Sequence, residues 1–103
     1  MASSIDYLRY VLEELLRDIK NITYKKMMGE YLLYKDNILF GGIYDDRFLI
    51  KKTKSVESLD FKEVIPYPSA KAMLLIDIED NEEIERIINL VIKDLKKQWR
   101  QYR

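Results

Sequence analysis

The sequence predicts an α+β domain of two layers, in which N- and C-terminal helices pack on one face of an antiparallel sheet of about five strands. The first observation is a hydrophobic period near 3.6 residues at both ends of the chain and near 2 residues between them. The second is that the links between the central segments are too short for parallel crossovers, which need about a dozen residues or more. Strands segregated from helices in this way are typical of α+β domains.

The first helix is predicted from its capping signal and its apolar stripe. Ser3 is placed to cap the helix with Asp6 as its capping-box partner, and Asn21 is placed to end it. An amphipathic helix with one buried side is therefore expected. Its predicted buried positions are Leu8, Val11, Leu12, Leu15, Leu16 and Ile19.

Four central segments have the length and the β-branched and aromatic content of strands. Asp36-Asn37 and Asp45-Asp46 are predicted to be hairpin turns, because Asn and Asp tolerate the positive φ that two-residue hairpins require. An antiparallel meander is therefore expected. Its four predicted strands span residues 22–28, 30–35, 38–44 and 47–51.

After the meander, the chain returns to a helical period through an irregular segment. Residues 53–69 contain Ser55, which is placed to begin a short helical turn, and two prolines that end regular structure. A fifth strand is predicted over residues 72–78, and Asn81 is expected to cap the last helix. The predicted buried stripe of that helix comprises Ile84, Ile87, Ile88, Val91, Leu95, Trp99 and Tyr102.

Length and composition exclude several function classes. A chain of 103 residues is predicted to form one domain, residues 1–103. Eighteen basic and eighteen acidic side chains cancel, so no whole-molecule field attracts nucleic acid. Because the sequence has neither cysteine nor histidine, disulfides and the commonest metal ligands are excluded, and no cofactor or metal is predicted. Neither a signal peptide nor a membrane span is found, so a cytoplasmic location is expected.

Acidic and glycine-rich patterns in the meander have structural interpretations that outweigh the chemical ones. Glu30, Asp45 and Asp46 could offer oxygen ligands to Mg²⁺, but neighbouring aspartates in a turn rarely converge on one ion. Gly29, Gly41 and Gly42 lack the Lys-Ser or Lys-Thr and the helix start of a phosphate loop. We interpret these glycines as sites of a bulge, a sharp coil or close backbone approach.

A basic stripe along the last helix leaves nucleic-acid binding as an alternative that is not favoured. Cations are favoured near a helix C-terminus in any case, and the aromatic residues of this helix fall on its apolar side. The neutral net charge also argues against a nucleic-acid partner. The stripe comprises Lys93, Lys96, Lys97 and Arg100.

Both alternating sets of residues in the predicted strands are apolar or aromatic. Tyr31 and Leu33 alternate with Leu32 and Tyr34, whereas a sheet covered on one face should alternate apolar with polar residues. Either residues 54–69 cover the second face, or that face meets a partner, since aromatic surfaces favour association. We expect some self-cover together with a patch for a protein partner or a homodimer, and no membrane contact.

An ordered set of short motifs runs through most of the chain. It comprises Met27-Met28-Gly29-Glu30-Tyr31, Gly41-Gly42-Ile43-Tyr44-Asp45-Asp46-Arg47, Lys51, Pro66-Tyr67 and Ala70-Lys71-Ala72-Met73. In order and spacing, this set resembles the N-terminal domain of the bacterial TfoX/Sxy family, which is named for regulators of natural competence. The resemblance implies a fold similar to that of secretion chaperones. It also implies a regulator that acts with the cyclic-AMP receptor protein on competence genes. Full-length regulators carry a second, C-terminal domain that these 103 residues do not include, so a stand-alone TfoX-like domain without catalytic residues is expected.

The sequence therefore predicts a non-catalytic, cytoplasmic regulatory domain that works through protein contacts. Arg47 is expected to pair with Glu30 or Asp45 rather than to hold an anion. The alternative is a small-molecule-binding protein or minor enzyme that uses the corner formed by these same three residues. The predicted functional surface, at strand ends of the meander, comprises Glu30, Tyr31, Tyr44, Asp45, Arg47 and Lys51.

Overall fold

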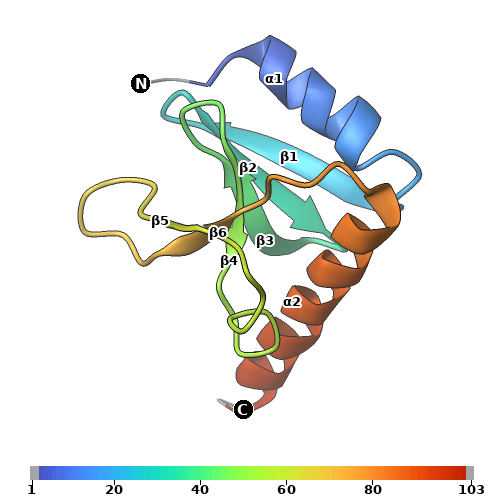
Figure 1. Ribbon diagram of the computed structural model, residues 1–103, viewed down its shortest axis with the longest axis vertical. Helices are drawn as coiled ribbons and strands as arrows, with labels where there is room; N and C mark the ends of the chain where they lie inside the picture. The colour runs from blue at the N-terminus through green and yellow to red at the C-terminus, as the bar shows by residue number, and fades with distance from the viewer. Residues whose placement is uncertain (1–2, 102–103) are drawn as a thin grey trace.

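The fold is an antiparallel sheet with helices on one face, which confirms the predicted class. The computed structural model describes the backbone of residues 3–101 and the side chains of residues 3–98. Figure 1 shows both helices on one side of the sheet, while the loop between β5 and β6 lies on the side away from the helices. The elements are α1 (Ile5–Tyr10), a π-helical turn η1 (Val11–Leu15), β1 (Ile22–Met27), β2 (Glu30–Lys35), β3 (Ile38–Ile43), β4 (Phe48–Lys51), β5 (Glu63–Val64), β6 (Met73–Leu75) and α2 (Asn81–Gln101).

Six strands form one sheet in the order β1-β2-β3-β4-β6-β5, and all neighbours are antiparallel. The four strands of the meander lie within one residue of their predicted limits. The strand predicted over residues 72–78 is shorter, because only Leu49, Ile50 and Lys51 of β4 pair with it. Its other edge pairs with the two-residue β5, which the sequence pattern did not predict.

The hairpin turns adopt backbone conformations that their residues favour, with one exception. Asp36-Asn37 has φ of 52° and 64°, and Asp45-Asp46 has φ of 54° at both residues, so both predicted turns are confirmed. The turn between β1 and β2 is formed by Met28 (φ 53°) and Gly29 (φ 84°). Methionine has no short polar side chain to favour the left-handed region, so Met28 sits in a conformation that costs free energy.

Two glycines of β3 provide space rather than positive φ. A Cβ on Gly41 would lie 2.3 Å from the carbonyl oxygen of Leu49. A Cβ on Gly42 would lie 2.6 Å from the carbonyl oxygen of Tyr31 and 2.8 Å from Cε2 of the Tyr44 ring. A β-bulge also shifts the register of the β2–β3 pair. The predicted close backbone approach is thus confirmed at Gly41 and Gly42, the bulge lies beside Gly41 rather than at a glycine, and Gly29 serves a turn instead.

The first helix begins and ends differently from its prediction. Ser4 Oγ accepts the Tyr7 N–H at 3.1 Å, so Ser4 caps the helix and the assignment of Ser3 was wrong. The reason is that the Ser3 N–H is bound to the carbonyl oxygen of a neighbouring turn, which keeps the chain extended up to Ser4. The helical turns end at Leu15 rather than near Asn21, which instead lies in a loop with positive φ.

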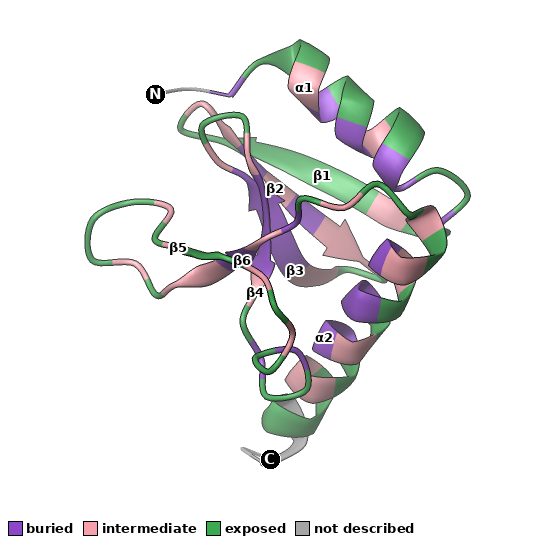
Figure 2. Cartoon of the chain, in the orientation of Figure 1, coloured by how far each residue is buried: buried purple, intermediate pink, exposed green. Residues whose placement is uncertain are grey.

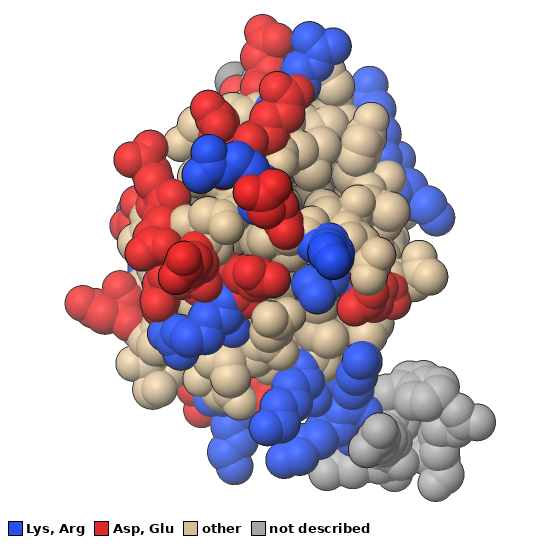
Figure 3. Space-filling model, turned by 90° about the vertical axis from the view of Figure 1, so that its right-hand side faces the viewer, with Lys and Arg blue, Asp and Glu red and all other residues tan. Residues whose placement is uncertain are grey.

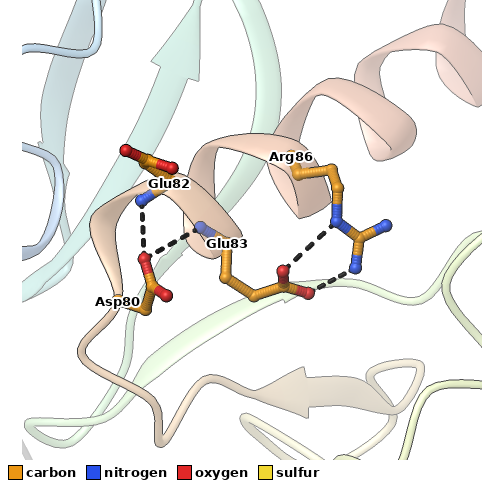
Figure 4. Close-up of polar contacts among 4 residues, drawn as sticks. All are labelled: Asp80, Glu82, Glu83 and Arg86. Atoms are coloured by element: carbon orange, nitrogen blue, oxygen red, sulfur yellow. Dashed lines mark hydrogen bonds and ion pairs between the residues drawn. The ribbon is translucent and has the colours of Figure 1, made fainter.

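The last helix also has a different cap. Figure 4 shows the Asp80 carboxylate accepting the backbone N–H groups of Glu82 and Glu83, at 3.0 and 3.3 Å. Asp80 therefore caps α2, and the assignment of Asn81 was wrong. The Asn81 side chain instead donates to the carbonyl oxygen of Arg17 at 2.6 Å. It thereby ties the end of the first helical segment to the start of α2.

The segment after β4 forms hydrogen-bonded turns instead of the helical turn predicted from Ser55. The N–H groups of Val56 and Glu57 both donate to the carbonyl oxygen of Thr53. Ser55 does not cap them, because its N–H and Oγ donate to the Asp94 carboxylate of α2 at 2.8 and 2.7 Å. The segment thus packs on the helical side of the sheet, where Val56 is wholly buried.

One core lies between the sheet and the helices, as Figure 2 shows by burial. The predicted stripes of both helices enter it, with Leu12 and Leu95 only partly buried, whereas the Trp99 and Tyr102 side chains lie outside the described residues. In the part of the chain that the structure describes, no helix combines the length and hydrophobicity needed to cross a membrane. Large, fully buried side chains of the core are Leu8, Leu33, Phe40, Ile43, Phe48, Ile50, Leu74, Ile84, Ile87 and Ile88.

Candidate functional site

The candidate site lies mainly on the second face of the sheet, the face opposite the helices in Figure 1, and one of its cavities also reaches Leu95 and Gln98 of α2. Strand alternation places Lys51 and its β6 partner Met73 on this face, because their neighbours Ile50 and Leu74 point into the core. Leu49 also points this way and is wholly buried without joining the core between sheet and helices. The second face therefore has a buried side chain at its centre, although the helices pack on the other face.

The loop between β5 and β6 covers part of the second face. The Tyr67 ring lies 6.3 Å from the Tyr44 ring, centroid to centroid, with the planes inclined at 46°. Of the predicted covering segment, residues 54–69, only the portion around Pro66 and Tyr67 reaches this face, since the portion around Val56 packs on the other one. The expectation of partial self-cover is thus confirmed.

Two open cavities adjoin the Tyr44–Tyr67 contact. The first, which we call the lysine cavity, has a volume of about 470 Å³. The second, the methionine groove, has a volume of about 790 Å³. The principal side chains around the lysine cavity are Tyr44, Lys51, Lys52, Thr53, Tyr67 and Lys71. The principal residues around the methionine groove are Met27, Met28, Glu30, Leu32, Tyr44 and Tyr67.

Burial shifts the pKa values of two cavity residues in opposite directions. The Tyr44 hydroxyl has a raised pKa, chiefly because burial disfavours the phenolate and secondarily because of nearby Tyr67 and Glu30. The pKa of Lys51 is lowered, first by burial and then by repulsion from the Lys71 ammonium group. The Lys71 ammonium group thus lies close enough to disfavour the charged form of Lys51.

The predicted acidic corner is used to hold the polypeptide together. Ser3 Oγ donates to Glu30 Oε1 at 2.6 Å and accepts the Asp46 N–H at 3.1 Å. The Asp45 N–H donates to both oxygens of the Glu30 carboxylate, at 3.3 and 3.1 Å. The Asp46 carboxylate in turn accepts the Ser4 N–H at 2.8 Å. These hydrogen bonds fasten the segment before α1 to the β1–β2 and β3–β4 hairpins.

Within residues 3–98, no cluster of three or more acidic side chains is arranged to hold a metal ion. Arg47 was predicted to form an ion pair with Glu30 or Asp45. Within the same residues 3–98 it forms neither pair, so this prediction was wrong. Arg47 Nε instead donates to the carbonyl oxygen of Tyr44 at 3.2 Å, across their own turn. The reason is that the Glu30 carboxylate already faces the Asp45 N–H and Ser3.

The six residues of the predicted surface are divided among three places. Tyr44 and Lys51 meet at the lysine cavity. Glu30 borders the methionine groove, while Asp45 and Arg47 lie at the turn beside it. Tyr31 is 5% exposed and packs edge-on against Tyr24 on the helical side, so it belongs to the core.

The cavity residues that were absent from the predicted surface include Met28, Tyr67 and Lys71. Met28 and Tyr67 are 98% and 58% exposed. The signal that could have identified Tyr67 is its place between two prolines, which keep it out of a helix or a central strand where an aromatic side chain would join the core. Lys71 lacked such a signal, because its approach to Lys51 depends on how the loop folds back.

Comparison of this chain with protein-family models, with curated proteins and with solved structures returned no match.

Proposed function

We propose that this chain is a non-catalytic, cytoplasmic, TfoX-like domain that works through protein contacts on the second face of its sheet. The regulatory role, in the transcriptional control of competence, rests on the resemblance of its ordered motifs to the TfoX/Sxy family. The site of contact rests on geometry. The methionine groove is the apolar part of the face that the helices leave open.

The observation that carries the proposal is the exposure of Met28 at a strained turn. Its side chain is 98% exposed, so it contributes no packing, and its backbone has φ of 53°. The other two hairpin turns use Asp and Asn at the equivalent positions. A residue that opposes the local conformation without a compensating contact is expected at functional sites. Flexible methionine side chains suit protein-binding surfaces because they adapt to different partners.

Neighbouring residues extend this surface. Met27 is 52% exposed, and Tyr67 presents an aromatic ring across the groove. Aromatic and methionine side chains are enriched where proteins meet, and lysine is depleted there. The methionine groove is therefore better suited to a protein partner than the lysine cavity beside it. The partner is either another protein or a second copy of this chain.

The proposal is tested by placing a photo-crosslinking amino acid at Met28 and, as a control, at Ile5. Ile5 is 47% exposed but belongs to α1 on the other side of the sheet. Irradiation in the native host should give a discrete adduct from position 28 and not from position 5. Mass spectrometry identifies the partner, and an adduct of twice 12.4 kDa identifies a homodimer. Equal adducts from both positions, or none from position 28, would contradict the proposal.

The small-molecule or enzymatic alternative has less support at the corner where it was predicted. Glu30 is held by Ser3 and the Asp45 N–H, and Arg47 is bonded to a backbone carbonyl. A general acid or base there would have to break a hydrogen bond that fastens α1 to the sheet. The corner is therefore better explained as a structural element.

The nucleic-acid alternative has a defined location. Lys35, Lys93, Lys96 and Lys97 border an open cavity of about 380 Å³, and Figure 3 shows basic side chains gathered towards the C-terminal end of the molecule. Acidic side chains cover much of the rest of that view, so the basic area is small. The side chain of Arg100 lies outside the described residues. If this area binds nucleic acid, gel retardation should weaken steeply with salt.

A further inference from the structure

We propose that the lysine cavity binds a small organic anion, with Lys51 and Lys71 holding its phosphate or carboxylate group and Tyr44 and Tyr67 packing against a planar ring. This proposal does not depend on the protein contact proposed above. The two cavities share Tyr44, Pro66 and Tyr67, and the rest of their walls is formed by different residues.

The charge of the cavity wall is the first argument. Among the described residues, three lysines border the cavity and no aspartate or glutamate does. Lys52 is neutralised by Glu63, at 3.1 Å between Nζ and Oε2. Within residues 3–98, neither Lys51 nor Lys71 forms an ion pair. The cavity therefore holds two positive charges that nothing in its own wall balances.

The position of Lys51 is the second argument. Its side chain is half-buried at the end of β4, whereas an unpaired lysine can usually extend its ammonium group into water. Burial and the Lys71 charge both lower its pKa, which means that the empty cavity disfavours the charged form. An anion between the two ammonium groups would remove the repulsion and form charge-assisted hydrogen bonds with both.

The shape of the wall is the third argument. Tyr44 lies over the bare backbone of Gly42, which leaves no room for a Cβ beneath the ring. Tyr67 is held between Pro66 and Pro68, residues with restricted backbones. The two rings are thus positioned in advance of binding, and apolar residues such as Leu39 complete the wall. Apolar walls with a few convergent polar groups are typical of small-molecule sites.

An additional polar group lies at the same cavity. Thr53 is 6% exposed, and its hydroxyl has no hydrogen-bond partner of normal geometry among the described residues. It lies near enough to the Asp94 carboxylate to lower the pKa of that group, so part of its polarity is already satisfied. Because the buried Thr53 hydroxyl can form a further hydrogen bond, it favours a ligand with hydrogen-bonding oxygens. The volume of about 470 Å³ is in the usual range for small-molecule pockets.

The test uses phenyl phosphate and benzoate, which join a planar ring to each of the two anionic groups. Phenol supplies the ring alone, and inorganic phosphate supplies the anion alone. Binding is followed by amide chemical shifts of the whole chain in low salt. We expect phenyl phosphate or benzoate to bind more tightly than phenol and inorganic phosphate, with shifts clustered at Tyr44, Lys51, Tyr67 and Lys71. If neither compound binds at millimolar concentration, the proposal is wrong.

Matched lysine variants locate the binding. K51M and K71M should each weaken binding about tenfold or more, because each removes a charge-assisted hydrogen bond. K20M removes an exposed lysine that borders neither cavity and should leave the affinity unchanged. K51R keeps the charge and should restore part of the binding even if K51M is less stable. Equal weakening by K20M would indicate attraction to net charge alone and would overturn the proposal.

A lysine titration provides an independent readout. With ¹³C-labelled lysine side chains, Lys51 should titrate below its ordinary range in the free protein, and its pKa should rise when phenyl phosphate is added. The ¹³C signals of Lys20 should not respond to the ligand. A Lys51 pKa that is the same with and without saturating ligand would show that the anion binds elsewhere, contrary to the proposal.

Discussion

The two faces of the sheet are built from the same strands but differ in how far their side chains are buried. On the helical face, Phe40, Phe48 and Ile50 are completely buried. On the second face, Leu32 and Leu39 remain partly exposed, at the edges of open cavities. The difference shows that apolar composition alone does not make a core. A face becomes a core only when other elements of the chain are long enough and close enough to cover it.

The largest contrast between the faces is expected from truncating one side chain on each. F48A should lower the free energy of unfolding by about 3–5 kcal/mol, because it leaves a cavity in a close-packed core. L32A, at a partly exposed position, should cost about 1 kcal/mol or less. Urea unfolding monitored by circular dichroism measures both. Similar losses from the two variants would mean that the second face is covered in solution, for example in a dimer.

The contact between Tyr44 and the sheet is tested by filling the space that Gly42 leaves. G42A should cost about 1–3 kcal/mol, because the new methyl group meets both the Tyr31 carbonyl oxygen and the Tyr44 ring. In the double variant G42A/Y44A, the clash with the ring disappears and only the backbone clash remains. The two substitutions should therefore be non-additive when their unfolding free energies are compared. Strict additivity would place the Tyr44 ring away from Gly42.

The tether between the Ser55 turn and α2 should give the helical side a pH dependence. Burial tends to raise the pKa of Asp94, but hydrogen bonds from Ser55 and Thr53 and the Lys97 charge together outweigh it, so the pKa lies below its ordinary value of 3.8. A lowered pKa in the folded state means that the stabilisation is complete above the ordinary value and is lost as the pH falls through the folded value.

D94N should therefore cost about 1 kcal/mol at pH 7, with the difference from the parent chain shrinking as the pH drops below about 4. Thermal unfolding at a series of pH values measures this. D77N, an exposed carboxylate outside the tether, is the control. A D94N penalty that persists unchanged at the lowest pH would show that the charge of Asp94 does not contribute.

The smallest expected effect is a gain in stability at the open face. M28N should raise the free energy of unfolding by about 0.5–1 kcal/mol, because Asn-Gly suits a turn with two positive φ values and Met-Gly does not. The same variant should weaken partner binding if Met28 is retained for contact. A loss of stability would instead mean that the methionine side chain packs against its own domain in solution.

Sequence reasoning succeeded where the governing interactions are local. The strands of the meander and both Asp/Asn turns follow from alternation and from the tolerance of these residues for positive φ. It was wrong by one residue at both helix caps, because Ser3 and Asn81 are used for contacts with distant backbone groups. The residue type indicates which positions can cap a helix. It does not indicate which of two adjacent candidates already forms hydrogen bonds elsewhere.

The candidate site was predicted only in part. Tyr44 and Lys51 were selected from the sequence and do share a cavity. Tyr31 was selected with them, but alternation along β2 turns it to the helical face. The carboxylate of Glu30 is engaged by Ser3, a residue 27 positions away in the chain. Lys71 was overlooked because nothing near it in the sequence indicates its approach to Lys51.

The sequence by itself determined that a meander of four strands lies between two helical segments, the antiparallel pairing of β1 to β4 and the location of the two Asp/Asn hairpin turns. Each of these depends on residues only a few positions apart. The tertiary structure decided which of two apolar faces the helices cover, which carboxylates form hydrogen bonds between distant parts of the chain, and which lysines meet at a cavity. The physical reason is that alternation is ambiguous when both faces are apolar. Only the packing of segments far apart in the chain resolves that ambiguity.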